Sequence, residues 1–266
     1  MSKPFPPSIQ PEATFNEYVK EFGGELISEL LPNNPNFDNA DYLFRREGVV
    51  AELKCLEKDF FSEEEYRKKL NKLYSRWVDE GLAPIIVGRK AIQTKDLPLK
   101  CQHDVANIVK RPVENRIQKA NKQIKQTKAH FGLNDAKGLL IMVNDGNYSL
   151  ESDAVMYLVR RIVNTQCTAI DSTIYFTVNM PASMPGVERD ILVWIDTHRV
   201  DPQNGVSREF LNAIREGWLS FLGRKTGEDI PVIRNVRNDD LENIKFIKEA
   251  KTAREPQASE NKSSNK

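Results

Sequence analysis

The sequence has few of the residues on which several classes of metal site depend. It contains three histidines, His103, His130 and His198, and they lie far apart in the chain. This spacing argues against histidine-rich metal nucleases, zinc hydrolases and zinc fingers, which need several nitrogen or sulfur ligands close together. The three cysteines are equally isolated. They form no CxxC pair and no disulfide framework, which is typical of proteins from a reducing compartment.

Long apolar segments and two common catalytic motifs are also missing. No apolar run approaches the length of a membrane span. The N-terminal stretch MSKPFPPSIQP lacks the apolar region of a secretory signal, so we expect a cytoplasmic protein without a membrane partner. The motifs GxxxxGK(S/T) and GxSxG do not occur, which argues against a P-loop and against a serine-hydrolase nucleophile elbow.

The composition that remains is that of an ordinary globular protein. With 266 residues, the chain could form one large domain or a core domain with an elaboration. Hydrophobic residues make up 39% and charged residues 29% of it. The net charge of +1 neither requires nor excludes a nucleic-acid partner, because phosphate contacts are made by a local basic patch.

Apolar periodicity predicts a mixed α/β chain with a central sheet. The first dozen residues are rich in proline and should be irregular, and the polar tail from about residue 250 should be disordered. Helices are expected at about 13–31, 62–80, 112–131, 152–164 and 207–222. Strands are expected at about 41–44, 49–56, 84–87, 138–143, 173–178 and 190–195. Pro112 suits the start of the third helix, and Gly132 suits its end.

The predicted strand 49–56 carries the most informative pattern. Because side chains alternate between the two faces of a strand, Glu52 and Lys54 share one face with Val50 and Leu56. Two ionisable groups in the middle of an otherwise apolar strand are costly unless they are paired or used. The simplest interpretation is an ordinary cross-strand ion pair on a solvated face. The alternative is a site that carries chemistry.

A hairpin could bring a third ionisable group to this pair. If the turn is an even-length loop centred on Arg46 and Glu47, Phe44 pairs with Val49, and Asp41 lies opposite Glu52. A three-residue loop ending in Gly48 would instead move Asp41 to the other face. In the even register, two carboxylates converge beside one ammonium group and repel each other unless a cation lies between them. Mg²⁺ is the obvious candidate, because it binds one or two carboxylates together with substrate phosphate.

The spacing Asp41-x10-Glu52-x-Lys54, behind one amphipathic helix, resembles the PD-(D/E)xK nuclease superfamily. The resemblance covers residues 13–145 and implies a restriction-endonuclease-like core, with a central mixed sheet flanked by helices. Residues 146–249 would then be a C-terminal α/β extension packed on that core. Two features depart from the family pattern: Ala40 replaces the proline before the aspartate, and the helix at 62–80 looks like an insertion.

The resemblance also implies roles for individual residues. Asp41, Glu52 and the backbone carbonyl of Leu53 would hold Mg²⁺, for which Mn²⁺ could substitute. Lys54 would orient the attacking water or stabilise developing charge. Many relatives add a glutamate from the first helix, and Glu29 is our choice because it falls within the apolar stripe; a boundary residue is the alternative. Gln123 would point at the site, as a residue of the corresponding helix does in several branches.

The helix at 112–131 is strongly basic, with Glu114 as its only acid. Such a face could bind nucleic-acid phosphates, although a solvated face is the simpler interpretation. The candidate contacts are Arg116, Lys119, Lys122, Gln123 and Lys125. The sequence thus favours a metal-dependent nuclease acting on nucleic acid, DNA in particular, in restriction, repair or phage defence. A homodimer or a partner subunit would be compatible with this function. The alternative is a catalytically silent relative that binds nucleic acid or assembles with other proteins.

Overall fold

A computed structural model of the chain describes residues 8–33, 35–86, 96–199, 202–228, 230 and 244–247. The N-terminal half contains α1 (Pro11–Phe22), β1 (Glu25–Leu26), α2 (Ile27–Leu30), β2 (Tyr42–Phe44), β3 (Val49–Leu56), α3 (Glu64–Asp79) and α4 (Leu99–His130). The C-terminal half contains β4 (Lys137–Asn144), α5 (Ser152–Gln166), β5 (Ser172–Thr177), β6 (Ala182–Ser183), β7 (Trp194–His198), α6 (Arg208–Thr226) and β8 (Lys245–Phe246).

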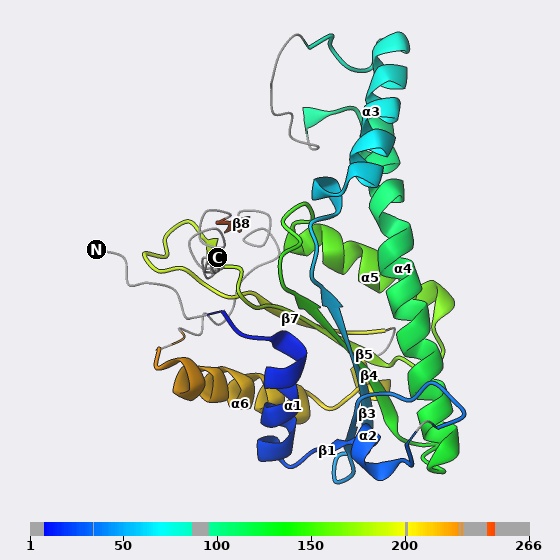
Figure 1. Cartoon of the computed structure of the whole chain (residues 1–266), viewed down its shortest axis with the longest axis vertical. Coiled ribbons are helices and arrows are strands. Elements are labelled where there is room, and N and C mark those ends of the chain that lie inside the picture. Colours follow the sequence, from blue (N-terminus) through cyan, green and yellow to red (C-terminus); the bar gives the residue numbers. More distant parts are fainter. Residues whose placement is uncertain are drawn as a thin grey trace, which may run out of the picture.

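A mixed six-stranded sheet in the order β1-β2-β3-β4-β5-β7 forms the centre of the molecule. The neighbouring strands β3, β4 and β5 are parallel, whereas β1 and β2 on one side and β7 on the other run antiparallel to their neighbours. Helices α4 and α5 cover one face of this sheet, and α1 and α6 cover the other (Figure 1). The predicted α/β class with a central mixed sheet flanked by helices is therefore confirmed.

The two faces of the sheet have separate apolar cores, because side chains along each strand alternate. On β3, Val50 packs beneath α4 and α5, whereas Ala51 packs with α1 and α6. Residues 172–226, which lie within the expected C-terminal extension 146–249, supply β5 and β7 to this same sheet. They also supply α6, whose Trp218 packs against Phe15 of α1 with ring centroids 5.1 Å apart.

The expected first helix, 13–31, is wrong in its second half. α1 ends at Phe22, and Gly23 follows with a φ of 95°, a left-handed conformation that favours glycine at the end of a helix. Gly24 then passes so close to Val19 and Phe44 that a Cβ would lie 2.6 Å from the Phe44 ring. The chain turns here into β1 and the short helix α2, so the apolar spacing beyond Phe22 does not belong to one helix.

The expected helix at 112–131 is part of a helix more than twelve residues longer at its N-terminal end. α4 begins at Leu99, and Pro112 lies inside it rather than at its start. The added segment packs against α3 around Trp77, Cys101 and Val105, and the two helices form an arm that stands out from the body (Figure 1). The sequence predicts a helix around Trp77 but none around Val105, so it does not predict that two helices pack together into this arm.

Two expected strands also differ. The expected strand at 84–87 is wrong for residues 84–86, which form no regular element, and Val87 lies outside the described residues. The expected strand at 190–195 is displaced towards the C-terminus: Ile191 makes only an isolated bridge with Ala182, and β7 pairs with β5 from Trp194 onwards. The tail at 250–266 is outside the described residues, as are residues 1–7. Among the described helices, none is long and apolar enough to cross a membrane.

Candidate metal site and basic groove

The β2–β3 hairpin sets the geometry of the site. Phe44 pairs with Val49 across the loop 45–48, so the even-length register predicted from the sequence is confirmed. Asp41 lies just before β2, and its backbone N–H donates to the Ala51 carbonyl at 3.2 Å, one residue out of the regular ladder. Its Oδ2 accepts a hydrogen bond from the Leu53 N–H at 2.8 Å. The side chains of Asp41 and Glu52 interact directly, so the expected convergence of the two carboxyl groups is present.

Of the two neighbouring carboxyl groups, Glu52 is buried and Asp41 is half-buried. Glu52 is only 1% exposed, and burial followed by the negative charge of Asp41 raises its pKa to about 8. The pKa of Asp41 is also raised, mainly by burial, although the Leu53 N–H and the charge of Lys54 oppose the increase. At neutral pH the pair therefore retains a proton unless another positive charge takes its place.

Lys54 and Gln123 complete the polar cluster. The Lys54 Nζ donates to Oε1 of Glu52 and, at 3.0 Å, to Oε1 of Gln123. The Gln123 Nε2 in turn donates to the carbonyl of Asn39 at 2.7 Å. Gln123 reaches the cluster from α4, which is where the family resemblance expected it. The interpretation of Glu52 and Lys54 as an ion pair on a solvated face is wrong, because the two side chains are 1% and 16% exposed.

A second contact from α4, not anticipated from the sequence, holds the chain just before Asp41. The fully buried Thr127 Oγ1 accepts a hydrogen bond from the Ala40 N–H at 2.8 Å. Gln123 and Thr127 are one helical turn apart, so α4 fixes Asn39 and Ala40 together. A threonine inside the otherwise apolar stripe of the helix at 112–131 was the available signal.

Asp41, Glu52 and the Leu53 carbonyl could hold a hard divalent cation. Oε2 of Glu52 is buried and has no hydrogen-bond partner among the described residues. The N–H and C=O of a strand residue point to the same side. Because the Leu53 N–H points to the β2 side, its carbonyl also faces that side, where β2 has already ended. The described part of the chain holds no group of three or more His, Cys, Asp or Glu side chains suited to a metal. The set would thus leave several positions to water, as Mg²⁺ commonly does.

Glu29 lies outside this cluster. It is exposed on α2 and forms an ion pair with Lys20 of α1 at 2.5 Å. The acid of the first helix that does influence Asp41 is Glu12, whose negative charge contributes to the raised pKa of that carboxyl. Glu12 lies in the first turn of α1, one residue before the start of the expected helix.

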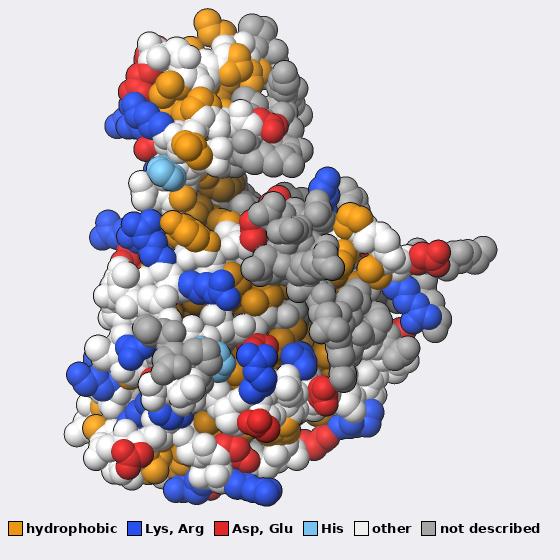
Figure 2. All heavy atoms as spheres, turned by 180° about the vertical axis from the view of Figure 1, so that it is seen from behind, with side chains coloured by type: hydrophobic (Ala, Val, Ile, Leu, Met, Phe, Trp, Pro, Cys, Tyr) orange, Lys and Arg blue, Asp and Glu red, His pale blue; other side chains and the backbone are white. Residues whose placement is uncertain are grey.

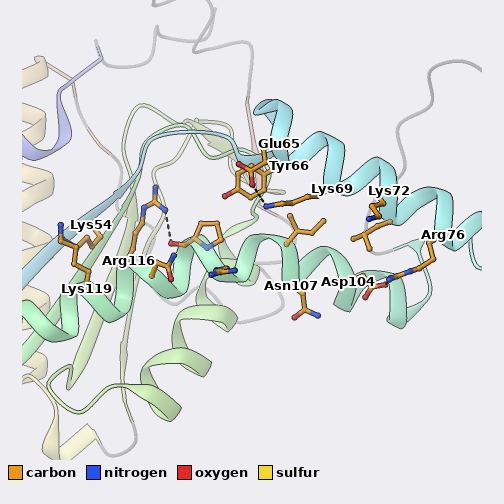
Figure 3. A pocket seen from close by; sticks show the side chains of 15 residues that line it. Lys54, Glu65, Tyr66, Lys69, Lys72, Arg76, Asp104, Asn107, Arg116 and Lys119 are labelled. Atoms are coloured by element: carbon orange, nitrogen blue, oxygen red, sulfur yellow. Dashed lines mark hydrogen bonds and ion pairs between the residues drawn. The ribbon is translucent and has the colours of Figure 1, made fainter.

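A groove of about 1240 Å³ runs from the cluster between α3 and α4 (Figure 3). Lys54 and Lys119 lie at its inner end, and Arg76 and Asp104 lie at the far end. Of the expected nucleic-acid contacts, Arg116 and Lys119 line this groove, whereas Lys122 forms an exposed ion pair with Asp38 at 2.8 Å. Lys125 is exposed on α4 and does not line the groove.

The cluster combines two converging carboxyl groups, an ammonium group held by an amide, and a basic groove that begins at that ammonium group. Such a combination can bind a divalent cation and place a phosphate of a polyanion beside it. Comparisons with protein-family models, with curated proteins and with solved structures find no match to this chain.

Proposed function

We propose that this protein is a metal-dependent nuclease that hydrolyses phosphodiester bonds in nucleic acid, DNA in particular. The observation that carries the proposal is the pair of half-buried Asp41 and buried Glu52 beside Lys54, and Lys54 lies at the inner end of a basic groove. The elements around the pair support a restriction-endonuclease-like core. A helix precedes the hairpin that carries the acidic residues, and α4 connects β3 to the parallel strand β4.

In this proposal Asp41, Glu52 and the Leu53 carbonyl hold Mg²⁺ or Mn²⁺, which when bound would polarise the scissile phosphate and lower the pKa of a water. Lys54 projects from the same strand face as Glu52 and also lines the groove, so its ammonium group can contact a phosphate lying there. Its positive charge would stabilise the negative charge that builds up on the phosphate. Gln123 acts as a positioning residue, because it holds the Lys54 ammonium through Oε1 and is itself anchored to Asn39.

Cleavage assays with purified protein test this proposal. Linear, circular and single-stranded DNA are incubated with Mg²⁺, with Mn²⁺ or with EDTA, and cleavage is expected only with a metal. Lys54→Ala should slow cleavage by roughly 10²–10³-fold, as loss of one preorganised charge typically does, while metal binding survives. Asp41→Asn should lose both metal binding and cleavage.

Two matched variants control for unspecific effects of these changes. Lys122→Ala removes an exposed lysine of α4, and Glu29→Gln neutralises an exposed acid of α2, so both should cleave at nearly the wild-type rate. Cleavage by Lys54→Ala at the wild-type rate would show that the active site lies elsewhere. If none of the DNA substrates is cleaved with either metal, the nuclease proposal is contradicted.

A catalytically silent nucleic-acid-binding subunit is the second candidate. One observation favours it: Lys54 lines the groove, but Asp41 and Glu52 do not. A silent subunit would bind DNA equally well with and without metal and would not bind Mn²⁺ at micromolar protein concentration. Isothermal titration of Mn²⁺ into wild-type protein and into Asp41→Asn distinguishes the two candidates, because only a metal site built on Asp41 produces heat that the variant lacks.

A further inference from the structure

The arm formed by α3 and the first part of α4 has a structure of its own. Its small core, with Trp77 only 1% exposed, holds the two helices together above the sheet. From behind, the arm is joined to the body by a narrower neck, and Lys and Arg side chains lie on both (Figure 2). The groove described above follows the side of this arm and ends at Lys54 in the body.

The charges in the groove are mostly uncompensated. Both acids that line it are paired with neighbouring cations: Glu65 with Lys69 at 2.6 Å, and Asp104 with Arg76. Four further cations line it and have no carboxylate partner among the described residues: Lys72, Arg111, Arg116 and Lys119. A row of unpaired cations leading to one site indicates a polyanionic ligand that passes along it.

The groove also has an apolar floor. Tyr66, Leu73, Ile108 and Pro112 contribute to its lining, and Tyr66 lies near Lys69 in Figure 3. A ligand that carried only phosphates would not use these groups. A single nucleic-acid strand does, because it can turn its bases towards an apolar surface while its backbone follows the cations.

The spacing of the helices argues against a duplex in the same place. α3 and α4 pack directly against each other through the arm core, and packed helices lie about 8–10 Å apart. A double helix presents its outer phosphates, and its paired bases cannot contact apolar side chains between two such helices. The groove extends along α4 from Asp104 to Lys119, about 22 Å at the rise of an α-helix, which suits a short single-strand site of about four nucleotides or more.

We propose that the groove between α3 and α4 binds a single-stranded segment of the nucleic acid and leads it to Lys54. This inference rests on the proposed nuclease function for the meaning of Lys54 but not for the binding itself. It narrows the substrate class to nucleic acids that have a single-stranded region next to the scissile phosphate. The chemistry of the groove suits DNA and RNA alike, so both are used as probes.

The test measures fluorescence anisotropy of labelled dT15, rU15 and a blunt 15-base-pair duplex in EDTA, so that cleavage plays no part. Wild-type protein should bind a single strand at least about tenfold more tightly than the duplex. The double variant Lys72→Glu, Arg111→Glu should lose roughly tenfold or more of that affinity and should show a shallower salt dependence. Thermal unfolding confirms that each variant is folded.

The matched control is Lys68→Glu, Arg67→Glu. It changes the net charge by the same amount, at two exposed residues of α3 that do not line the groove. It should retain nearly all of the affinity for single strands. Equal or tighter binding of the duplex, or equal losses in the two double variants, would overturn the groove assignment. If wild-type protein binds single strands through the groove but cleaves nothing, the nuclease proposal fails and the groove assignment stands. If the wild-type protein cleaves with metal but the two double variants bind single strands equally well, the groove assignment fails and the nuclease proposal stands.

Discussion

Glu52 is the residue whose environment departs furthest from that of an ordinary surface acid. Its neighbours on β3 are apolar, and it shares its face of the sheet with Asp41 and Lys54. Burial favours the neutral carboxyl, whereas a cation between the two acids would favour the charged form. Binding of a metal ion should therefore release a proton, and metal affinity should rise with pH through the pKa of Glu52.

The raised pKa of Glu52 predicts how the stability of the metal-free protein depends on pH. Its pKa is about 8 in the folded protein, against an ordinary value of 4.5. Between pH 4.5 and about 8, Glu52 is therefore protonated in the folded state and ionised in the unfolded state. The stabilisation is fully present below about pH 4.5 and is lost as pH rises through about 8.

Thermal unfolding in EDTA, measured from about pH 5 to about pH 9, checks this prediction. The midpoint of the wild-type protein should fall with rising pH more steeply than that of Glu52→Gln, whose side chain cannot ionise. Mg²⁺ should restore the stability of the wild-type protein at high pH but not that of the variant. Parallel curves for the two proteins in EDTA would show that Glu52 does not titrate in this range.

Residue-scale reasoning from the sequence recovered much of the candidate site, and its failures have physical causes. Asp41, Glu52 and Lys54 could be placed together because a strand alternates and a hairpin fixes its register, whereas Gln123 was expected there only from the family resemblance. Glu29 could not be placed correctly, because its position depended on a helix that ends at Gly23. Asn39 takes part through its backbone carbonyl, which no side-chain pattern reveals.

At the scale of elements, the turn after α1 decides where β1 and the hairpin begin. Gly24 has Val19 and the Phe44 ring within 3 Å of the position that a Cβ would take. Gly24→Ala should thus destabilise the protein by about 1–3 kcal/mol, as overpacking of a well-packed core does. Urea unfolding followed by circular dichroism gives the change in the free energy of unfolding.

The neighbouring glycine supplies the control for that substitution. Gly23 has a left-handed φ, but no atom lies within 4 Å of the position that a Cβ would take there. Asparagine tolerates that backbone conformation, so Gly23→Asn should cost much less than Gly24→Ala. A larger loss for Gly23→Asn would mean that backbone conformation, rather than close packing, makes the turn depend on glycine.

The arm is the element that sequence periodicity could not place. The apolar spacing from Val113 onwards predicts the second part of α4, but Pro112 favours a helix start and so excludes Cys101 and Val105 from the same helix. Proline inside a helix is rare because it has no N–H to donate and its ring clashes with the carbonyl four residues earlier. Here the segment of α4 before Pro112 packs against Trp77 of α3, and this contact stabilises the helix on that side of the proline.

At the scale of the whole molecule, both halves of the chain contribute to one sheet and to both of its apolar faces. β4 pairs with β3 on one side and with β5 on the other. On the far face, α1 packs on α6: the Tyr18 hydroxyl donates to the Ile214 carbonyl at 2.7 Å, and its ring lies 5.5 Å from that of Trp218. The parallel β3–β4 pair and the α1–α6 contact thus join segments far apart in the sequence.

This shared sheet predicts that the chain up to the end of β4 does not fold alone. A fragment that ends at Leu150 would lack β5, β7, α5 and α6, which leaves the edge of β4 unpaired and exposes the apolar side chains of α1. Exposed edges and large apolar surfaces favour aggregation over folding. The fragment should therefore show no cooperative unfolding in urea, whereas the full chain should unfold cooperatively when followed by tryptophan fluorescence. A soluble fragment with a sharp transition would instead show that the chain up to Leu150 folds independently of the segments that follow it.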